Sequence, residues 1–217
     1  MKPTKKTTVK RAPKRGHYDK ETIYKILDDD FVCQIAFIHE DFPVIIPTIY
    51  GRKDNAIYIH GATVSRMLVT LEQGLPISVN VTKTDGLVLA RSAFHHSLNY
   101  RSVTIFAKGI LVTDEKERLE ALKIISDQII PGRWEEVRLP NAKEMKATKI
   151  IKIPIEEASA KIRTGPPVDD KPDYDLPIWA GVLPIRTVYE LPIADPKLAD
   201  DISVSQSIID QKASNND

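Results

Sequence analysis

The sequence predicts a mainly-β protein, a closed or partly closed β-barrel with a few helices at its periphery. Three observations lead to this fold class. Short segments rich in β-branched and aromatic residues recur along the chain, and turn residues separate them. Helical patterns are few and do not alternate regularly with the strands, which disfavours a doubly wound sheet. The length of 217 residues is enough for one well-buried domain or two very small ones.

A helix and three strands are expected in the first third of the chain. Asp19 can cap the helix, and the apolar residues that follow it fall on one face. The second strand contains Pro47, and a proline there indicates an edge, a bulge or a bend. The predicted elements are a helix over 18–30 and strands over 31–39, 43–50 and 56–60.

The following part of the chain adds strands and two helices. Asp85-Gly86 marks a turn between two strands, and Gly109 is expected to form a β-bulge. Asp114 and Glu117 resemble a capping box at the start of a helix that ends near Ile130. The predicted elements are helices over 63–73 and 114–130, strands over 76–82, 87–90, 101–113 and 148–155, and an extended segment over 156–163.

The two ends of the chain differ from the part between them. Residues 1–17 carry seven basic residues and no acid, which predicts a basic flexible arm, with a nucleic-acid contact as the alternative. Residues 186–217 read as a polar, mobile tail. Residues 18–185 are therefore expected to form the folded domain. The formal net charge is only +1, so we expect neither nucleic acid nor a membrane as a partner.

Cysteine content limits the chemistry further. The single cysteine, Cys33, excludes an internal disulfide and a thiolate metal cluster within the chain. It lies in an apolar strand, where a buried and inert thiol is expected. No apolar run is long enough to span a bilayer, and the N-terminus lacks the apolar core of a secretory signal. We therefore expect a cytoplasmic protein.

The first candidate site is a strand, the sequence HGATVSR and a helix, within residues 56–67. Glycine allows a close backbone approach, and free N–H groups at the start of a helix favour an anion. Ser65 and Arg66 would add a hydroxyl group and a cation, which suits one phosphate. The patterns of a P-loop and of a dinucleotide fingerprint are missing. A plain helix cap with a surface arginine is the alternative interpretation.

The second candidate site is the polar segment 85–102 between two apolar strands. Its two arginines, two histidines and several hydroxyl groups can bind an anionic ligand. The pair His95-His96 suggests a metal, but the ligand set is incomplete without a nearby cysteine and with few carboxylates, so we expect no metal. An ordinary surface loop is the alternative.

The third candidate site lies near the end of the predicted domain. Trp179 stands next to Ala180-Gly181, which leaves room for a planar partner, although a tryptophan that closes the core is the alternative. The Gly/Pro/Asp-rich loop 164–175 has few apolar anchors and is expected to act as a flap. No nucleophile and base stand out anywhere, so no catalytic residue is assigned.

These segments resemble the pyridoxamine 5'-phosphate oxidase-like superfamily. More narrowly, they are similar to its flavin-nucleotide-binding branch, which also includes the nitroimidazole-resistance (Nim) reductases. The resemblance covers about residues 11–185, with the motifs in the family order. The motifs are RGHYDKETIYKILDD, FPVIIPTIY, IYIHGATVSRML, DGLVLARSAFHHSLNYRSV, PGRWEEVR, EASAKIRTGPPVDD and LPIWAGVLPI.

The resemblance implies a fold, a cofactor and an assembly. The fold would be a six-stranded split barrel of the FMN-binding type, and the protein a homodimer with FMN at its interface. The protein would be an oxidoreductase acting on an unknown small-molecule substrate, with NAD(P)H or oxygen as redox partner and FMN as the electron carrier. The alternative is a non-catalytic protein that binds or senses flavin, or a haem-binding protein on the same barrel.

The resemblance also implies which residues bind the cofactor. The strand–turn–helix segment would hold the flavin phosphate, and the bent strand would lie along the ring. The polar loop would approach the cofactor, and a C-terminal aromatic residue would reach it from the partner subunit. The matching residues are Pro47, Thr48, Tyr50, His60, Gly61, Ala62, Ser65, Arg66, Arg91, Ser92, His95, Tyr100, Arg101, Ser102 and Trp179.

The sequence departs from the family pattern at two places. It lacks the arginine-containing C-terminal motif of the vitamin-forming oxidases, so we do not expect true pyridoxamine 5'-phosphate oxidase activity. The first strand has Cys33-Gln34 where relatives in this branch often have Cys-His. Any role of that histidine, including haem ligation, therefore does not transfer to this chain.

Overall fold

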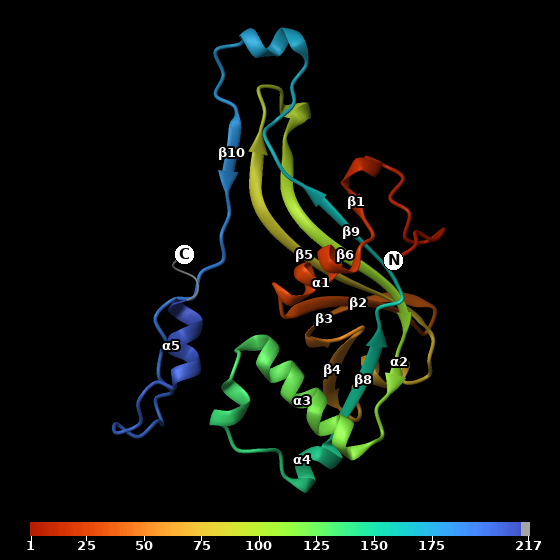
Figure 1. The fold of residues 1–217 in the computed structure, drawn as a ribbon, viewed down its shortest axis with the longest axis vertical. Helices are drawn as coiled ribbons and strands as arrows, with labels where there is room; N and C mark the ends of the chain where they lie inside the picture. Colours follow the sequence, from red (N-terminus) through yellow and green to blue (C-terminus); the bar gives the residue numbers. More distant parts are fainter. Residues whose placement is uncertain (214–217) are drawn as a thin grey trace.

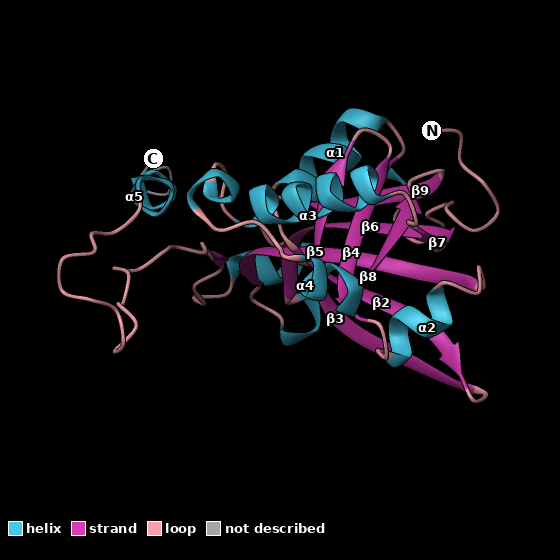
Figure 2. Ribbon diagram, turned by 90° about the horizontal axis from the view of Figure 1, so that it is seen from below, coloured by secondary structure: helices cyan, strands magenta, loops and turns pink. Residues whose placement is uncertain are grey.

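The structure is a computed structural model that describes residues 1–213. The ten strands within these residues form one antiparallel sheet that curves into a barrel, with helices around it (Figures 1 and 2). The strand order is β1-β9-β6-β5-β2-β3-β4-β8-β7, and β10 pairs with β5. The prediction of a mainly-β barrel with peripheral helices is confirmed.

The sheet holds more strands than the six that the resemblance implied, and β1, β7 and β10 are only two to four residues long. The strands are β1 (Gly16–His17), β2 (Val32–His39), β3 (Phe42–Lys53), β4 (Ala56–Ala62), β5 (Pro76–Leu89), β6 (Ser97–Lys108), β7 (Ile110–Leu111), β8 (Thr148–Pro154), β9 (Glu157–Arg163) and β10 (Gly181–Pro184). The α-helices are α1 (Lys20–Asp28), α2 (Arg66–Leu71), α3 (Glu115–Ile129), α4 (Ala142–Ala147) and α5 (Gln206–Ala213).

The barrel core follows from the alternation of side chains along the strands. In β2, Cys33, Ile35 and Phe37 are buried, whereas the residues between them face the other side of the sheet. The alternating residues of β5 and β6 pack in the same apolar cluster, and so do the buried residues of α1. Asp19 caps α1 by accepting a hydrogen bond from the amide of Thr22, as predicted.

A second apolar cluster lies between α3 and the outer side of β4 and β8. Ala121 and Ile125 of α3 pack there against Tyr58 and Ile150. A Cβ atom at Gly51 would lie 2.6 Å from the carbonyl oxygen of Ile124, so glycine is needed where α3 crosses β3. Helix α3 therefore lies directly on the sheet.

β5 differs from the prediction of two strands joined by a turn at Asp85-Gly86. It is one strand of 14 residues, with a shift of register between Thr84 and Gly86. The twist at this bulge lets β5 and β6 continue beyond the barrel as a long hairpin, the protruding pair of strands in Figure 1. Gly109 is a break between β6 and β7 rather than a bulge within one strand.

The basic N-terminal arm, expected to be flexible, packs on the barrel instead. β1 pairs with β9, and Thr7 is buried. The ammonium group of Lys6 forms an ion pair with Glu157 at 2.6 Å, and the amide of Val9 donates to the hydroxyl of Tyr18 at 2.8 Å. The sequence expectation failed because these contacts use backbone groups and single side chains, which leave no apolar periodicity.

The predicted polar tail, residues 186–217, also contains structure. Helix α5 lies within it, and the amide and hydroxyl of Ser207 both donate to the carboxylate of Glu136. Between β10 and α5 the chain stands away from the barrel (Figures 1 and 2). Residues 214–217 of the predicted tail lie outside the described part of the chain.

One face of the sheet carries large apolar side chains that no other element within residues 1–213 covers. On β2 and β3 they alternate with the core residues, so they share the side of the sheet that faces away from the core. Ile45 is 67% exposed, and Ile38 and Ile49 on the same side of the sheet are exposed as well. We call this surface the outer face and define it by Ile38, Pro43, Ile45, Pro47 and Ile49.

Candidate functional site

The segment between β4 and α2 carries polar side chains that have no partner among residues 1–213. β4 ends at Ala62, and Ser65 is the N-cap of α2, yet its hydroxyl group makes no capping hydrogen bond. Neither His60 nor Arg66 makes a side-chain hydrogen bond or an ion pair with any residue from 1 to 213. A free guanidinium group, a free hydroxyl group and a free imidazole can together bind one anionic group.

His60 lies near the end of β4, where neighbouring protein atoms partly desolvate its imidazole but leave it accessible to solvent. Desolvation by the surrounding protein lowers the pKa of its imidazole below the ordinary value, while the side chain remains accessible to solvent. The imidazole of His60 is thus partly surrounded by protein and still open to solvent. It is mainly neutral at neutral pH and can donate one hydrogen bond and accept another.

Gly61 and Ala62 are the last two residues of β4, directly before the turn that leads to α2. A Cβ atom at Gly61 would lie 3.0 Å from Cδ1 of Leu68, so the glycine lets α2 pack closely on β4. Ala62 is exposed, and its carbonyl oxygen accepts a hydrogen bond from the amide of Ser65 at 2.9 Å. The geometry of this segment therefore depends on small residues, as the sequence predicted.

The tip of the β5–β6 hairpin is organised around the buried carboxylate of Asp169. This carboxylate accepts hydrogen bonds from the amides of Arg91 at 3.1 Å and Ser92 at 3.2 Å. It also pairs with the guanidinium group of Arg91 at 3.2 Å. Burial alone would raise the pKa of Asp169, but these hydrogen bonds and the positive charge together hold it below the ordinary value.

This network changes two expectations from the sequence. Arg91 already pairs with Asp169 and stacks on the ring of Tyr174, so its charge is not free for a ligand in this chain. The loop 164–175 is fastened at Asp169 and is not the loosely held flap that its lack of apolar residues suggested. Polar hydrogen bonds anchor it instead.

The two histidines of the hairpin tip also have partners. His95 lies 3.4 Å from the carboxylate of Asp170, and Nδ1 of His96 accepts a hydrogen bond from the amide of Ala90 at 3.0 Å. Within residues 1–213, no group of three or more histidine, cysteine, aspartate or glutamate side chains is arranged to hold a metal ion.

The resemblance placed three consecutive residues of β6, Tyr100, Arg101 and Ser102, near the cofactor, but their side chains alternate between the two sides of the sheet. Arg101 forms ion pairs with Asp85 at 2.9 Å and Asp29 at 2.5 Å, so its charge is already neutralised within the chain. Tyr100 and Ser102 face the other side of the sheet. Arg101 therefore fastens the end of α1 to the bulge of β5, and its role as a cofactor contact stays a prediction.

The bent strand β3 places its predicted residues on two different sides. Pro47 lies on the outer face, while Thr48 and Tyr50 have the opposite orientation. Tyr50 is fully buried, and its hydroxyl group donates to the carbonyl oxygen of Leu27 at 2.6 Å. Its side chain belongs to the core, so we correct its assignment as a ring contact.

Trp179 is 68% exposed and lies just before β10. A Cβ atom at Gly181 would lie 2.9 Å from the indole ring, so glycine at this position lets the ring lie against the backbone. The indole does not close the core of its own chain, which was the alternative interpretation. It remains free to contact a partner or a ligand.

Arg163, at the end of β9, is a residue that the sequence analysis did not single out. Its buried guanidinium group donates to Asn99 and to the carbonyl oxygens of Gly165 and Pro166, both at 3.2 Å. Burial, with Arg15 nearby, lowers the pKa of Arg163 below its ordinary value. The sequence RTGPP predicted a turn, but no sequence signal indicated that an arginine would hold it.

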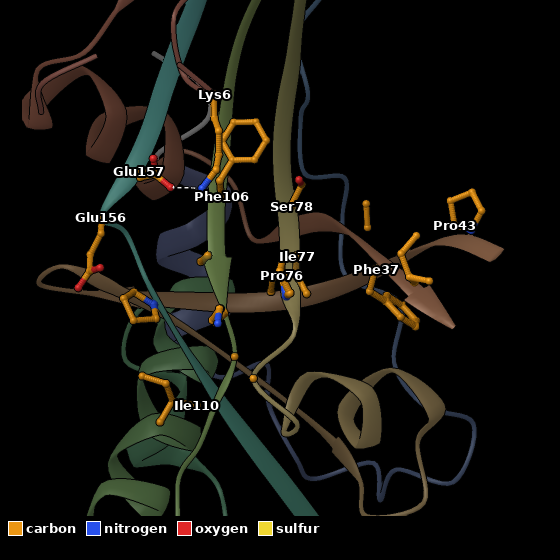
Figure 3. Close-up of a pocket in the computed structure, with 17 residues that line it drawn as sticks. Lys6, Phe37, Pro43, Pro76, Ile77, Ser78, Phe106, Ile110, Glu156 and Glu157 are labelled. Atoms are coloured by element: carbon orange, nitrogen blue, oxygen red, sulfur yellow. Dashed lines mark hydrogen bonds and ion pairs between the residues drawn. The ribbon is translucent and has the colours of Figure 1, made fainter. Parts of the chain in front are cut away.

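A hollow of about 830 Å³ in the structure contains none of the predicted site residues (Figure 3). It opens on the outer face beside Ile38 and Pro43 and continues to Phe106 and Ile110. Figure 3 shows the ion pair of Lys6 and Glu157 on one side of it. The predicted residues are thus distributed over the β4–α2 segment, the hairpin tip and the C-terminal segment, and one chain alone does not join them into one pocket.

A comparison with protein families matches residues 19–162 to the family described as pyridoxamine 5'-phosphate oxidase. The chain belongs to this family. The match includes the barrel, the β4–α2 segment and the hairpin, while Trp179 and the C-terminal segment follow it. A comparison with curated proteins gives no match.

Two solved structures are similar over nearly the whole chain. One is described as the flavocytochrome Anf3 from Azotobacter vinelandii, which is 38% identical with a TM-score of 0.91 and covers 96% of this chain and 97% of its own. The other is described as an FAD and heme binding protein from Mycobacterium smegmatis, which is 33% identical with a TM-score of 0.88 and covers 91% and 97%.

A third structure shows the fold alone. It is described as a putative 5-nitroimidazole antibiotic resistance protein from Bacteroides thetaiotaomicron, with 17% identity and a TM-score of 0.56, and it covers 68% of this chain and 86% of its own.

Among residues 1–213, no helix is both long enough and apolar enough to cross a membrane.

Proposed function

We propose that this protein binds a flavin nucleotide whose phosphate is held by His60, Ser65 and Arg66. One observation carries the proposal: these three side chains have no partner within residues 1–213, and they follow one another closely in the sequence where β4 ends and α2 begins. The other two arginines of the predicted site, Arg91 and Arg101, already pair with carboxylates. Arg66 is therefore the arginine of this set that is available for a phosphate.

The nucleotide is either FMN, which the family resemblance implied, or FAD, which the name of the Mycobacterium smegmatis relative mentions. FAD contains the FMN portion, so both molecules offer the phosphate that the β4–α2 segment would hold. The test is to denature the purified protein and to identify the released cofactor by chromatography against FMN and FAD standards. A colourless protein that takes up neither compound would contradict the proposal.

The site would be completed in a homodimer. The outer face leaves Ile38, Ile45 and Ile49 exposed on a regular sheet, and Trp179 is exposed without contributing to the core of its own chain. A second copy would cover the outer face, and its Trp179 would reach the flavin. Sedimentation equilibrium should give a mass near twice 24.4 kDa, and Ile45→Asp should shift the protein toward the monomer because a charge would enter the interface.

The bound flavin would make the protein an oxidoreductase that accepts electrons from NAD(P)H and passes them to oxygen or a small molecule. The protein would hold and orient the flavin, while the flavin supplies the electron chemistry. Anaerobic mixing with NADH or NADPH should bleach the flavin absorbance. If neither reagent bleaches it, a flavin-binding or flavin-sensing role without catalysis becomes the better explanation.

A second candidate function is the binding of haem in place of flavin, with His60 as a haem ligand instead of a phosphate contact. The names of the two relatives that match nearly the whole chain, a flavocytochrome and an FAD and heme binding protein, favour it. The donor set includes a suitable ligand, because the imidazole of His60 has no partner among residues 1–213 and desolvation favours its neutral form. A Soret band in the purified protein that His60→Ala removes would support this candidate. A protein without that band after incubation with haem would contradict it.

A further inference from the structure

The segment between β10 and α5 is exposed without interruption. Every residue from 183 to 204 is exposed, and the backbone hydrogen bonds within 190–204 belong to local turns. We call residues 190–204 the C-terminal loop. Both of its ends are attached: β10 pairs with β5 on one side, and on the other side Arg133 donates to the hydroxyl of Ser205 at 2.7 Å.

The C-terminal loop exposes large apolar side chains at a density that is unusual for a solvated segment. Leu191 is 71% exposed and Ile193 is 96% exposed. Three further apolar residues of the loop, Leu198, Ile202 and Val204, are also exposed. The loop is anchored at both ends and points these apolar side chains away from its own chain, which indicates that they pack against a partner.

The charge of the loop is complementary to the N-terminal arm. The loop contains four acids and one lysine, whereas residues 1–17 contain seven bases and no acid. The acids are Glu190, Asp195, Asp200 and Asp201, and none forms an ion pair with a residue from 1 to 213. In one chain the arm and the loop lie at opposite sides of the molecule in both views (Figures 1 and 2). Contact between them therefore needs a second copy.

A solved relative supports a fixed shape for this segment. The Azotobacter vinelandii structure covers 96% of this chain, which leaves about 9 of the 217 residues unmatched, fewer than the 15 residues of the loop. At least part of the loop thus has a counterpart in a solved structure. An exposed apolar loop adopts one shape when it packs against a partner.

We propose that the C-terminal loop of one chain packs on a second copy, with Leu191 and Ile193 against its surface and the acids of the loop against its basic N-terminal arm. The inference rests on the homodimer of the proposed function. In a two-fold dimer, the loop of each chain packs on the other chain. The same dimer would therefore cover the loops and the outer faces of both chains.

The test is the dissociation constant of the full-length holoprotein dimer, measured by sedimentation equilibrium. The variant Leu191→Asp/Ile193→Asp should dissociate at least about tenfold more readily than the wild type, the scale of an interface hot spot. The matched control is Ala199→Asp/Ser203→Asp, which adds the same two charges to the same loop without removing a large apolar side chain. It should stay within about threefold of the wild type.

A charge exchange tests the pairing with the arm. Asp200→Lys/Asp201→Lys and Lys14→Glu/Arg15→Glu should each weaken the dimer, and the combination of all four changes should restore it. If the combination is no tighter than either pair, the loop does not face the basic arm.

The same measurements separate this inference from the proposed homodimer. If Ile45→Asp dissociates the dimer while Leu191→Asp/Ile193→Asp remains as tight as the wild type, the loop does not contribute and the homodimer stands. If the wild type is a monomer at every concentration, the homodimer and the inference fail together.

Discussion

The β4–α2 segment and the hairpin tip both collect arginine, histidine and serine, yet the structure uses them in opposite ways. At the hairpin tip, these side chains have partners inside the chain. Asp169 forms an ion pair with Arg91, and the carboxylate of Asp170 lies next to the imidazole of His95. In the β4–α2 segment, the side chains of Arg66 and Ser65 have no such partner among residues 1–213. The comparison teaches that polar residues in a conspicuous motif can be structural, and that the absence of partners marks the group left for a ligand.

The largest effect on stability is expected at the hairpin tip. Asp169→Asn would keep the shape of the side chain but remove the charge that two amides and a guanidinium group surround. We expect the midpoint of thermal unfolding to fall by roughly 4–8 °C, the range of a broken buried polar network. Scanning calorimetry measures it. An unchanged midpoint would mean that the tip is not held by Asp169.

The same carboxylate predicts a dependence on pH. The pKa of Asp169 is lowered in the folded state, so its contribution to stability is complete above the unfolded pKa of about 3.9 and is lost as the pH falls through the folded pKa. The difference in stability between the wild type and Asp169→Asn should therefore be constant from pH 5 to 7 and shrink below about pH 4. Urea unfolding at several pH values checks it. A difference that grows in acid would contradict this assignment.

A smaller effect is expected at Tyr50. Tyr50→Phe leaves the ring in the core but removes the donor to the carbonyl oxygen of Leu27, and loss of a buried hydrogen bond costs about 1–2 kcal/mol of unfolding free energy. Flavin affinity should not change, because the hydroxyl group lies inside the barrel. A loss of flavin affinity without a loss of stability would restore Tyr50 as a cofactor contact.

The smallest effect is expected at Cys33. Burial raises the pKa of its thiol to about 12, so almost no thiolate exists at neutral pH. A thiol reagent should react with the native protein only as fast as the barrel opens, and rapidly in denaturant. Fast reaction of the native protein would show that this side of the barrel core is accessible.

The sequence predicted the barrel well because alternation along a strand reports directly which side is buried. The helix caps Asp19 and Asp114 were predicted for a similar reason, since a cap bonds to an amide two or three residues away. The packed N-terminal arm and the anchored loop 164–175 were missed because their key contacts, Lys6 to Glu157 and Arg91 to Asp169, join residues 151 and 78 positions apart.

The candidate site was predicted in part, and the limit has a physical cause. Sequence spacing identified the β4–α2 segment, because its strand, turn and helix are local. It gave the same weight to Arg66, Arg91 and Arg101, because a sequence does not show which arginine meets a carboxylate in space. The exposed apolar residues of the C-terminal loop were read as part of a polar tail, since prolines and acids interrupt them.

The central claim is that Arg66 holds a phosphate and that Arg101 does not, and affinities for FMN and riboflavin test it most directly. Calorimetric titration of the apoprotein should show that Arg66→Ala weakens FMN binding roughly 10- to 150-fold, the value of a charge-assisted hydrogen bond. Riboflavin, which lacks the phosphate, should bind the wild type and Arg66→Ala equally weakly. Arg101→Ala, the matched control, should lower stability but keep the preference for FMN over riboflavin. If Arg66→Ala loses affinity for both ligands equally, or if Arg101→Ala abolishes the preference, the assignment of the phosphate to the β4–α2 segment is wrong.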